Sequence, residues 1–191
     1  MYVTEAMLEE AARRWGEPRR LALAFDISAR ERELVRGSRR DERSHDVTFF
    51  VARDERYAVI AKPSFPEGVW RAPSGGLHRG ETVEEGARRE ALEELGLDID
   101  LERYLLRIDA RFTVEDLVEP WQTHVFLARA REGELAPRDR REIRAARWAT
   151  RDELLGPIRE ALLATGFGLF RYRAALTDAT FARLDELAPA W

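Results

Sequence analysis

Three glutamates stand close together near the middle of the chain, in the segment EALEEL. Glu90 and Glu94 are four residues apart, and Glu93 lies between them. In an α-helix these spacings place all three carboxylates on one side. Like charges so close repel one another, and a hard divalent cation, which prefers oxygen ligands, would relieve the repulsion. The cluster therefore indicates a binding site for magnesium or a similar ion.

The residues around the cluster predict the helix that would carry it. Thr82 and Glu85 have the spacing of a capping box, and Gly96 suits the left-handed residue that ends a helix. We therefore expect a helix from about Val83 to Leu95, preceded by a glycine-rich loop at 75–80. A second face of this helix is apolar and fits burial against a sheet, with residues stepping by four: Val83, Ala87, Ala91 and Leu95.

A plain solvated helix is the alternative interpretation of the cluster. Glu-rich helices usually carry exposed Glu–Arg pairs, and Glu85 and Arg89 are spaced for one. The glycine loop and Glu81, at fixed distances before the helix, favour a functional site instead.

Residues 75–97 read GGLHRGETVEEGARREALEELGL and match G-x5-E-x7-R-E-(apolar)-x-E-E-x-G-(apolar) at every defined position. This pattern resembles the signature of the Nudix hydrolases, which use magnesium or a similar cation to cut diphosphates linked to nucleosides or other groups. The resemblance implies that Glu90, Glu93 and Glu94 face Mg²⁺ or Mn²⁺. It also implies a supporting role in the loop and helix for Gly75, Glu81, Arg89 and Gly96.

The reaction implied is metal-dependent hydrolysis of a phosphoanhydride bond in a nucleoside diphosphate linked to another moiety. Glu90 and Glu94 are the catalytic candidates in the box. A carboxylate must also take a proton from the attacking water, and in the family this base is either a box glutamate or a glutamate before the last strand. Glu142, six residues before Trp148, fits the second case. An ordinary surface residue is an equal alternative there, and weaker candidates are Glu115, Asp116 and Glu119.

Substrate-binding candidates lie in and just before the glycine loop. Arg71 could bind a phosphate through its fork of donors, or form a surface ion pair. Trp70 could stack on a base, as could Phe65 and Trp121, although proline-flanked aromatic residues more often pack into a core. His78 lies at a variable position of the loop, within reach of a substrate. The sequence leaves the identity of the diphosphate open.

Composition narrows the class of protein. A chain of 191 residues is long enough for one good core and short for two. The formal net charge of −4 shows no basic surplus, which argues against nucleic acid or an anionic membrane as a partner. The absence of cysteine excludes disulfides, thiol nucleophiles and cysteine-based zinc sites. Without a signal-peptide pattern or a membrane-length apolar run, we expect a cytoplasmic protein.

Lysine is almost missing from the chain. Lys62 is the only lysine, and arginine supplies the rest of the Lys+Arg total of 32. We attribute this to the codon usage of a GC-rich genome, with adaptation to heat as a weaker explanation.

The order of expected strands and helices is that of an α/β protein and resembles the Nudix α/β/α sandwich with a mixed sheet, over residues 44–155. Its strands are expected at 46–53, 56–62, 101–113, 121–131 and 145–149, with an acidic loop at 115–120. A helical segment at 156–191, with helices at 157–165 and 178–187, is expected to pack on this core.

Residues 1–43 form an N-terminal extension with an amphipathic helix and a strand at 19–28. Leu21, Leu23, Phe25 and Ile27 alternate on one side of this strand, which is too apolar to hang free. We expect it to join a sheet of its own subunit or of a partner, and family members with such extensions suggest a homodimer. Two other functions stay open, a non-catalytic regulatory Nudix domain that binds a nucleotide and an interaction protein built on the two end segments.

Overall fold

The computed structural model describes residues 3–39 and 44–188. In these residues a seven-stranded mixed sheet has the order β1-β5-β6-β2-β3-β7, and the short β4 pairs with β2. β1 runs parallel to β5 and β2 parallel to β6, whereas the other neighbours are antiparallel. The strands are β1 (Arg19–Asp26), β2 (His45–Arg53), β3 (Arg56–Ala61), β4 (Ser74–Gly75), β5 (Ile99–Val114), β6 (Leu117–Ala130) and β7 (Ala145–Thr150).

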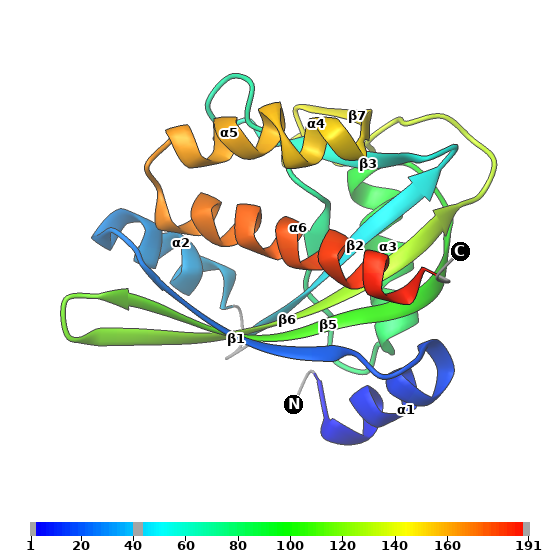
Figure 1. Cartoon of the computed structure of the whole chain (residues 1–191), viewed down its shortest axis with the longest axis horizontal. Helices are drawn as coiled ribbons and strands as arrows, with labels where there is room; N and C mark the ends of the chain where they lie inside the picture. Colours follow the sequence, from blue (N-terminus) through cyan, green and yellow to red (C-terminus); the bar gives the residue numbers. More distant parts are fainter. Residues whose placement is uncertain (1–2, 40–43, 189–191) are drawn as a thin grey trace.

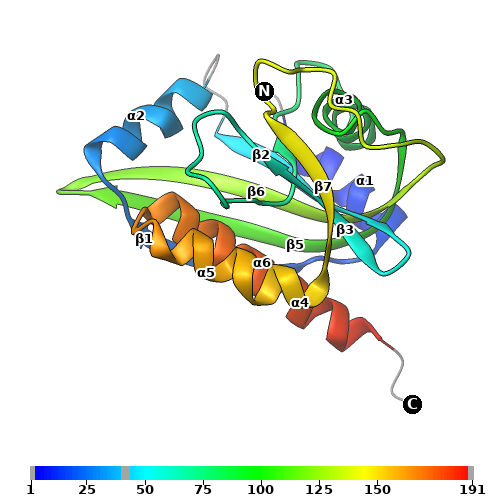
Figure 2. The same ribbon diagram turned by 90° about the horizontal axis from the view of Figure 1, so that it is seen from above.

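Helices cover both faces of this sheet and give the expected α/β/α sandwich (Figures 1 and 2). Neighbouring side chains of a strand point to opposite faces, so Phe49 packs into one apolar cluster and Phe50 into the other. α1 and α3 contribute to the cluster of Phe49, and α2, α4, α5 and α6 to that of Phe50. The helices are α1 (Glu5–Trp15), α2 (Ala29–Ser38), α3 (Val83–Glu94), α4 (Arg151–Leu155), α5 (Pro157–Ala164) and α6 (Gly168–Leu187).

The N-terminal strand joins the sheet of its own chain. β1 pairs with β5 from Arg19 opposite Leu106 to Asp26 opposite Thr113. Its half-buried side chains Leu21, Leu23 and Phe25 pack against the cluster that lies under α6. β1 is thus paired with β5 of its own chain and does not require a strand from a second subunit. The homodimer stays a prediction.

Two sequence-based boundaries were wrong. The expected acidic loop at 115–120 is a two-residue turn, Glu115–Asp116, because β5 and β6 continue pairing out to Val114 opposite Leu117. The left-handed φ of 53° at Glu115 lets the hairpin turn so tightly. Figure 1 shows this hairpin projecting beyond the other strands, where acidic side chains can remain in water.

α6 is much longer than the expected helix at 178–187. It begins at Gly168, and no side chain caps its first turn, so the sequence carries no capping pattern there. Its start is instead fixed by packing, since the backbone of Gly168 lies against the carbonyl of Asp26. In the part of the chain that the structure describes, no helix combines the length and apolar character needed to cross a membrane.

Candidate active site

The box helix α3 has the two ends that the sequence predicts. Thr82 accepts a hydrogen bond from the backbone N–H of Glu85 at 3.2 Å, and the Glu85 carboxylate accepts one from Thr82 N at 2.9 Å. At the other end Gly96 has a φ of 74° and donates its N–H to Leu92. A Cβ at Gly96 would lie 2.1 Å from the carbonyl oxygen of Ala136, so glycine is required for two reasons.

Arg89 ties the loop to the helix. Its guanidinium donates to both carboxylate oxygens of Glu81, at 2.7 and 3.0 Å, and to the carbonyl of Gly76 at 2.7 Å. These bonds raise the pKa of Arg89 and lower that of Glu81. Arg89 also reaches Glu90 at 2.9 Å and Glu93 at 3.2 Å. It therefore binds Glu81 and the box carboxylates, whereas Glu85, its partner in the solvated-helix interpretation, serves the cap.

Glu90 lies directly on the glycine that opens the box. A Cβ on Gly75 would come within 1.8 Å of Glu90 Cδ, so any side chain there would displace the carboxylate. Burial and the charge of Glu94 raise the pKa of Glu90 to about 7, against the opposing pull of Arg89. An ionised Glu90 is thus costly in this position until a cation neutralises it.

Glu94 is buried, with 3% of its surface exposed, and two groups hold it. Its Oε2 accepts a hydrogen bond from Ser74 N at 3.0 Å, and its Oε1 lies 3.3 Å from the Lys62 ammonium. The same ammonium is 3.1 Å from Glu142 Oε2. Lys62 therefore connects the box helix to Glu142, which is 59% exposed on the segment before β7.

The carboxylates fit a hard divalent cation by their chemistry. Within residues 3–39 and 44–188 no three acidic or histidine side chains are already arranged around one metal position. Arg89 binds Glu90 and Glu93, the latter 47% exposed, and Lys62 binds Glu94 and Glu142. The donors are carboxylate oxygens, and Glu90 and Glu94 form a buried like-charged pair, which favours Mg²⁺ or Mn²⁺ over a soft ion.

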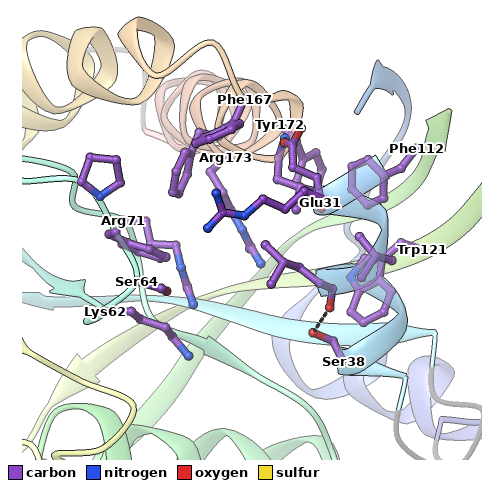
Figure 3. A pocket seen from close by; sticks show the side chains of 17 residues that line it. Glu31, Ser38, Lys62, Ser64, Arg71, Phe112, Trp121, Phe167, Tyr172 and Arg173 are labelled. Carbon is purple, nitrogen blue, oxygen red and sulfur yellow. Dashed lines mark hydrogen bonds between the residues drawn. The ribbon is translucent and has the colours of Figure 1, made fainter. Parts of the chain in front are cut away.

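A cavity of about 660 Å³ opens next to these carboxylates, a volume typical of small-molecule sites. Figure 3 shows Lys62, Ser64 and Arg71 on one side of it and Phe112 and Trp121 on the other. Further walls come from α2 and from the start of α6, which supply Leu34, Val35, Ser38, Leu169, Phe170, Tyr172 and Arg173.

Arg71 is the cation that joins the cavity to the box. It is 8% exposed and donates to Ala72 O at 2.7 Å and to Ser74 Oγ at 2.9 Å. Ser74 in turn donates its N–H to Glu94. Burial and the charge of Arg173 lower the pKa of Arg71 to about 10, so it remains a cation at neutral pH. Among the described residues no carboxylate lies within ion-pair distance of it, and the guanidinium is free to bind an anionic ligand group.

Arg173, by contrast, is already neutralised. It donates to Asp46 at 2.9 Å and to Thr48 at 3.0 Å. Burial alone would raise the pKa of Asp46, but Arg173, Thr123 and Trp121 stabilise the ionised form and bring the pKa below its usual value. Two members of this buried network, Trp121 and Arg173, line the cavity.

The structure brings some of the predicted residues to the site and leaves others outside it. Phe65 and Trp121 line the cavity. Trp70 does not line it and instead stacks with Arg147, whose guanidinium carbon is 5.1 Å from the ring centre. His78 is exposed and donates its backbone N–H to Glu81 at 2.7 Å, which holds the box loop.

Glu119, one of the weaker base candidates, is buried and paired with Arg32 and Arg39, each at 2.8 Å. The positions of Lys62, Ser74, Phe170 and Arg173 in the site were not predicted from the sequence. Only Lys62 carried a sequence signal, as the one lysine of the chain.

The sequence of this region matches the model of a known protein family. The model of the NUDIX domain matches residues 38–165, well over half of the chain. The chain belongs to the Nudix family. The matched region contains the complete box helix, β2 to β7, Lys62 and Arg71, whereas most of α2 and all of α6 lie outside it.

Curated relatives agree with this assignment. The oxidized purine nucleoside triphosphate hydrolase of Danio rerio is 40% identical over 80 residues, which cover 42% of this chain and 50% of that protein. The human 8-oxo-dGDP phosphatase NUDT18 is 36% identical over 114 residues, 58% of this chain and 33% of that protein. The chain thus spans half or less of the length of these relatives.

Solved structures share the fold at low sequence identity. A NUDIX hydrolase from Nitrosomonas europaea superposes with a TM-score of 0.53 at 18% identity, over 73% of this chain and 88% of that one. The solution structure of the E. coli ORF135 protein gives a TM-score of 0.51 at 20% identity, over 77% and 94% of the two chains. These similarities support the fold alone.

Proposed function

We propose that this Nudix chain hydrolyses a phosphoanhydride bond in a nucleoside diphosphate linked to another moiety, with Mg²⁺ or Mn²⁺ held by Glu90, Glu93 and Glu94. One observation carries the proposal. The buried Glu94 is joined through Lys62 and through Ser74 and Arg71 to a cavity of about 660 Å³ that could hold a nucleoside.

The divalent cation, when bound, supplies charge neutralisation for the phosphate oxygens and a water of lowered pKa. Lys62 and Arg71 line the cavity and would bind the diphosphate, Arg71 through a guanidinium that has no carboxylate partner among the described residues. The aromatic side chains on the opposite wall of the cavity would stack on the nucleobase and exclude water from the leaving group.

In the hydrolysis itself, the oxygen of the attacking water forms a bond to phosphorus while the bridging P–O bond breaks. The proton of that water goes to a carboxylate. Glu90 is one candidate base, because its carboxylate lies in the box beside Gly75. Glu142 is the second candidate base, because Lys62 places its carboxylate next to Glu94.

The names of the two relatives described above favour a nucleotide as substrate. One is an oxidized purine nucleoside triphosphate hydrolase and the other an 8-oxo-dGDP phosphatase. The cavity supports the same class, because its wall offers several aromatic rings for stacking.

The test is a hydrolysis screen with the full chain, in which the phosphorylated products are separated and identified by chromatography. Nucleoside triphosphates, ADP-ribose, dinucleoside polyphosphates, dinucleotide cofactors and sugar nucleotides would be offered with Mg²⁺ and with Mn²⁺. We expect turnover of at least one of these classes, loss of turnover on chelation, and recovery on adding the metal. Binding of a nucleotide without turnover under every metal condition would replace the proposal by a non-catalytic, regulatory Nudix domain.

A further inference from the structure

The ammonium of Lys62 lies where two parts of the site meet. Lys62 follows the last residue of β3, and its Nζ is 3.3 Å from Glu94 Oε1 and 3.1 Å from Glu142 Oε2. Its side chain is 22% exposed and lines the cavity. One lysine thus contacts a buried box carboxylate, a solvent-facing carboxylate and the space beside Arg71.

A divalent cation and this ammonium would compete for Glu94. The ammonium is a compact point charge that already lies within contact distance of Glu94 Oε1. A hard cation approaching the same carboxylate would meet a like charge at short range, which is unfavourable. Binding of the cation at Glu94 therefore favours movement of Lys62 away from this carboxylate.

The cavity gives the displaced ammonium a place to go. Lysine has a flexible four-carbon stem, and the Lys62 side chain already borders the cavity. On the proposed function, the diphosphate of the substrate lies at this end, between Lys62 and Arg71. An ammonium turned toward the cavity would contact phosphate oxygens instead of Glu94 and Glu142.

We propose that Lys62 is an exchangeable internal counterion, which neutralises Glu94 and Glu142 in the metal-free protein and transfers to a substrate phosphate when a divalent cation binds. The phosphate half of this inference rests on the proposed function, whereas the metal half stands on the contacts with Glu94 and Glu142. Metal and phosphate then strengthen each other's binding, and by linkage the coupling is reciprocal.

The residue type at position 62 suits this exchange. Arginine occupies every other Lys or Arg position of the chain. At position 62, however, a planar guanidinium could donate to both carboxylates at once and would dissociate from them less easily. Lysine binds them as a point charge and can leave. The Lys62→Arg variant should therefore hold the carboxylates more firmly than the natural residue, and Lys62→Met should release them.

The first experiment measures Mn²⁺ binding to the nucleotide-free full chain by calorimetry or electron paramagnetic resonance. Lys62→Met should bind Mn²⁺ about tenfold more tightly than the natural chain, because a competing cation is gone. Lys62→Arg should bind it more weakly. In the presence of Mn²⁺, Lys62→Met should bind inorganic diphosphate about tenfold more weakly, as expected for the loss of a charged hydrogen bond.

These opposite signs separate exchange from a structural role, which would weaken both ligands together. Arg129→Met removes a surface cation paired with Glu102 and should change neither affinity. Thermal unfolding of each variant establishes that it folds. An unchanged or weakened Mn²⁺ affinity in Lys62→Met overturns the exchange. The expected Mn²⁺ shift together with no turnover in the substrate screen would overturn only the proposed hydrolysis.

The second experiment uses the fact that Lys62 carries the only side-chain amine. Reductive methylation followed by mass spectrometry would compare Lys62 with the α-amino group as internal reference, at constant ionic strength. Methylation of Lys62 should accelerate on adding Mg²⁺, which frees the amine from its two carboxylates, and should slow again when inorganic diphosphate is added with Mg²⁺. A ratio of the two labelling rates that Mg²⁺ does not change would contradict displacement of the ammonium.

Discussion

The box helix and the cavity beside it are built in opposite ways. In the box the decisive contacts join residues close in sequence, such as Thr82 with Glu85 and Glu81 with Arg89. In the cavity they join distant segments, such as Arg173 with Asp46 and Phe65 with Phe170, whose ring centres are 5.1 Å apart. The difference implies that the shape of the box depends mainly on local spacing, whereas the shape of the cavity depends on how α2 and α6 pack over the sheet.

The largest expected effect on activity comes from substituting a carboxylate of the box helix. Glu94→Gln should lower turnover at least about a hundredfold, because it removes a ligand charge while an amide of the same shape keeps the packing. Glu84→Gln, on the same helix but paired with Arg14, is the matched control and should stay close to natural activity. Steady-state kinetics on the best substrate of the screen would decide. Natural activity in Glu94→Gln would remove this residue from the catalytic machinery.

A smaller effect on activity is expected from substituting a cation that lines the cavity. Arg71→Met should raise KM about tenfold with a smaller change in kcat, because the buried guanidinium lacks a carboxylate partner and is available to the substrate. The fold should survive, since the variant removes a desolvated cation and keeps an apolar stem. Arg147→Met, which removes an arginine outside the cavity lining that stacks on Trp70 and pairs with Glu153, is the control. A large fall in kcat at constant KM would show that Arg71 acts in the chemical step rather than in substrate binding. It would contradict the separation of roles between the box and the cavity.

The smallest effect concerns the metal-free stability of the box. The folded-state pKa of Glu90 is raised from 4.5 to about 7, so the folded protein holds a proton there that the unfolded chain has lost. Its contribution to stability is therefore fully present below about pH 4.5 and is lost as the pH rises through about 7.

Unfolding of the chelated protein between pH 5 and pH 8 tests this sign. Glu90→Gln should flatten the pH dependence and raise the melting temperature at pH 8, since the amide never ionises. Saturating Mg²⁺ should stabilise the natural protein more than the variant at that pH. A variant that melts lower than the natural chain at pH 8 would show that the Arg89 contact outweighs the cost of the buried charge.

Much of the fold could be predicted from the sequence, and the reason is physical. The box helix follows from its capping residues and β1 from its alternation, while β2 and β3 follow from two apolar runs joined by a charged turn. All these signals act within a few residues. The tight turn at Glu115–Asp116 and the start of α6 at Gly168 could not, because long-range pairing and packing set them. Local acidity at 115–120 suggested a loop, yet the strand pairing overrode it.

The same limit applies to the site. Arg89 contacts Glu81, and Glu90 lies against Gly75, between residues that the box pattern already names. The sequence offered no means to place Lys62 between Glu94 and Glu142, since the three residues come from different elements. Its uniqueness as a lysine was visible, but composition alone favoured an explanation from codon usage.

The position of β1 at the edge of the sheet also has a consequence for synthesis on the ribosome. Its partner β5 is made much later, and α6, which packs on Leu21, Leu23 and Phe25, is made later still. Until then the first strand exposes apolar side chains and an unpaired edge, the features that chaperones bind and that promote aggregation. A nascent chain that terminates before α6 would therefore retain every box residue but expose the apolar side chains of β1. Chaperones and proteases would treat such a chain as misfolded.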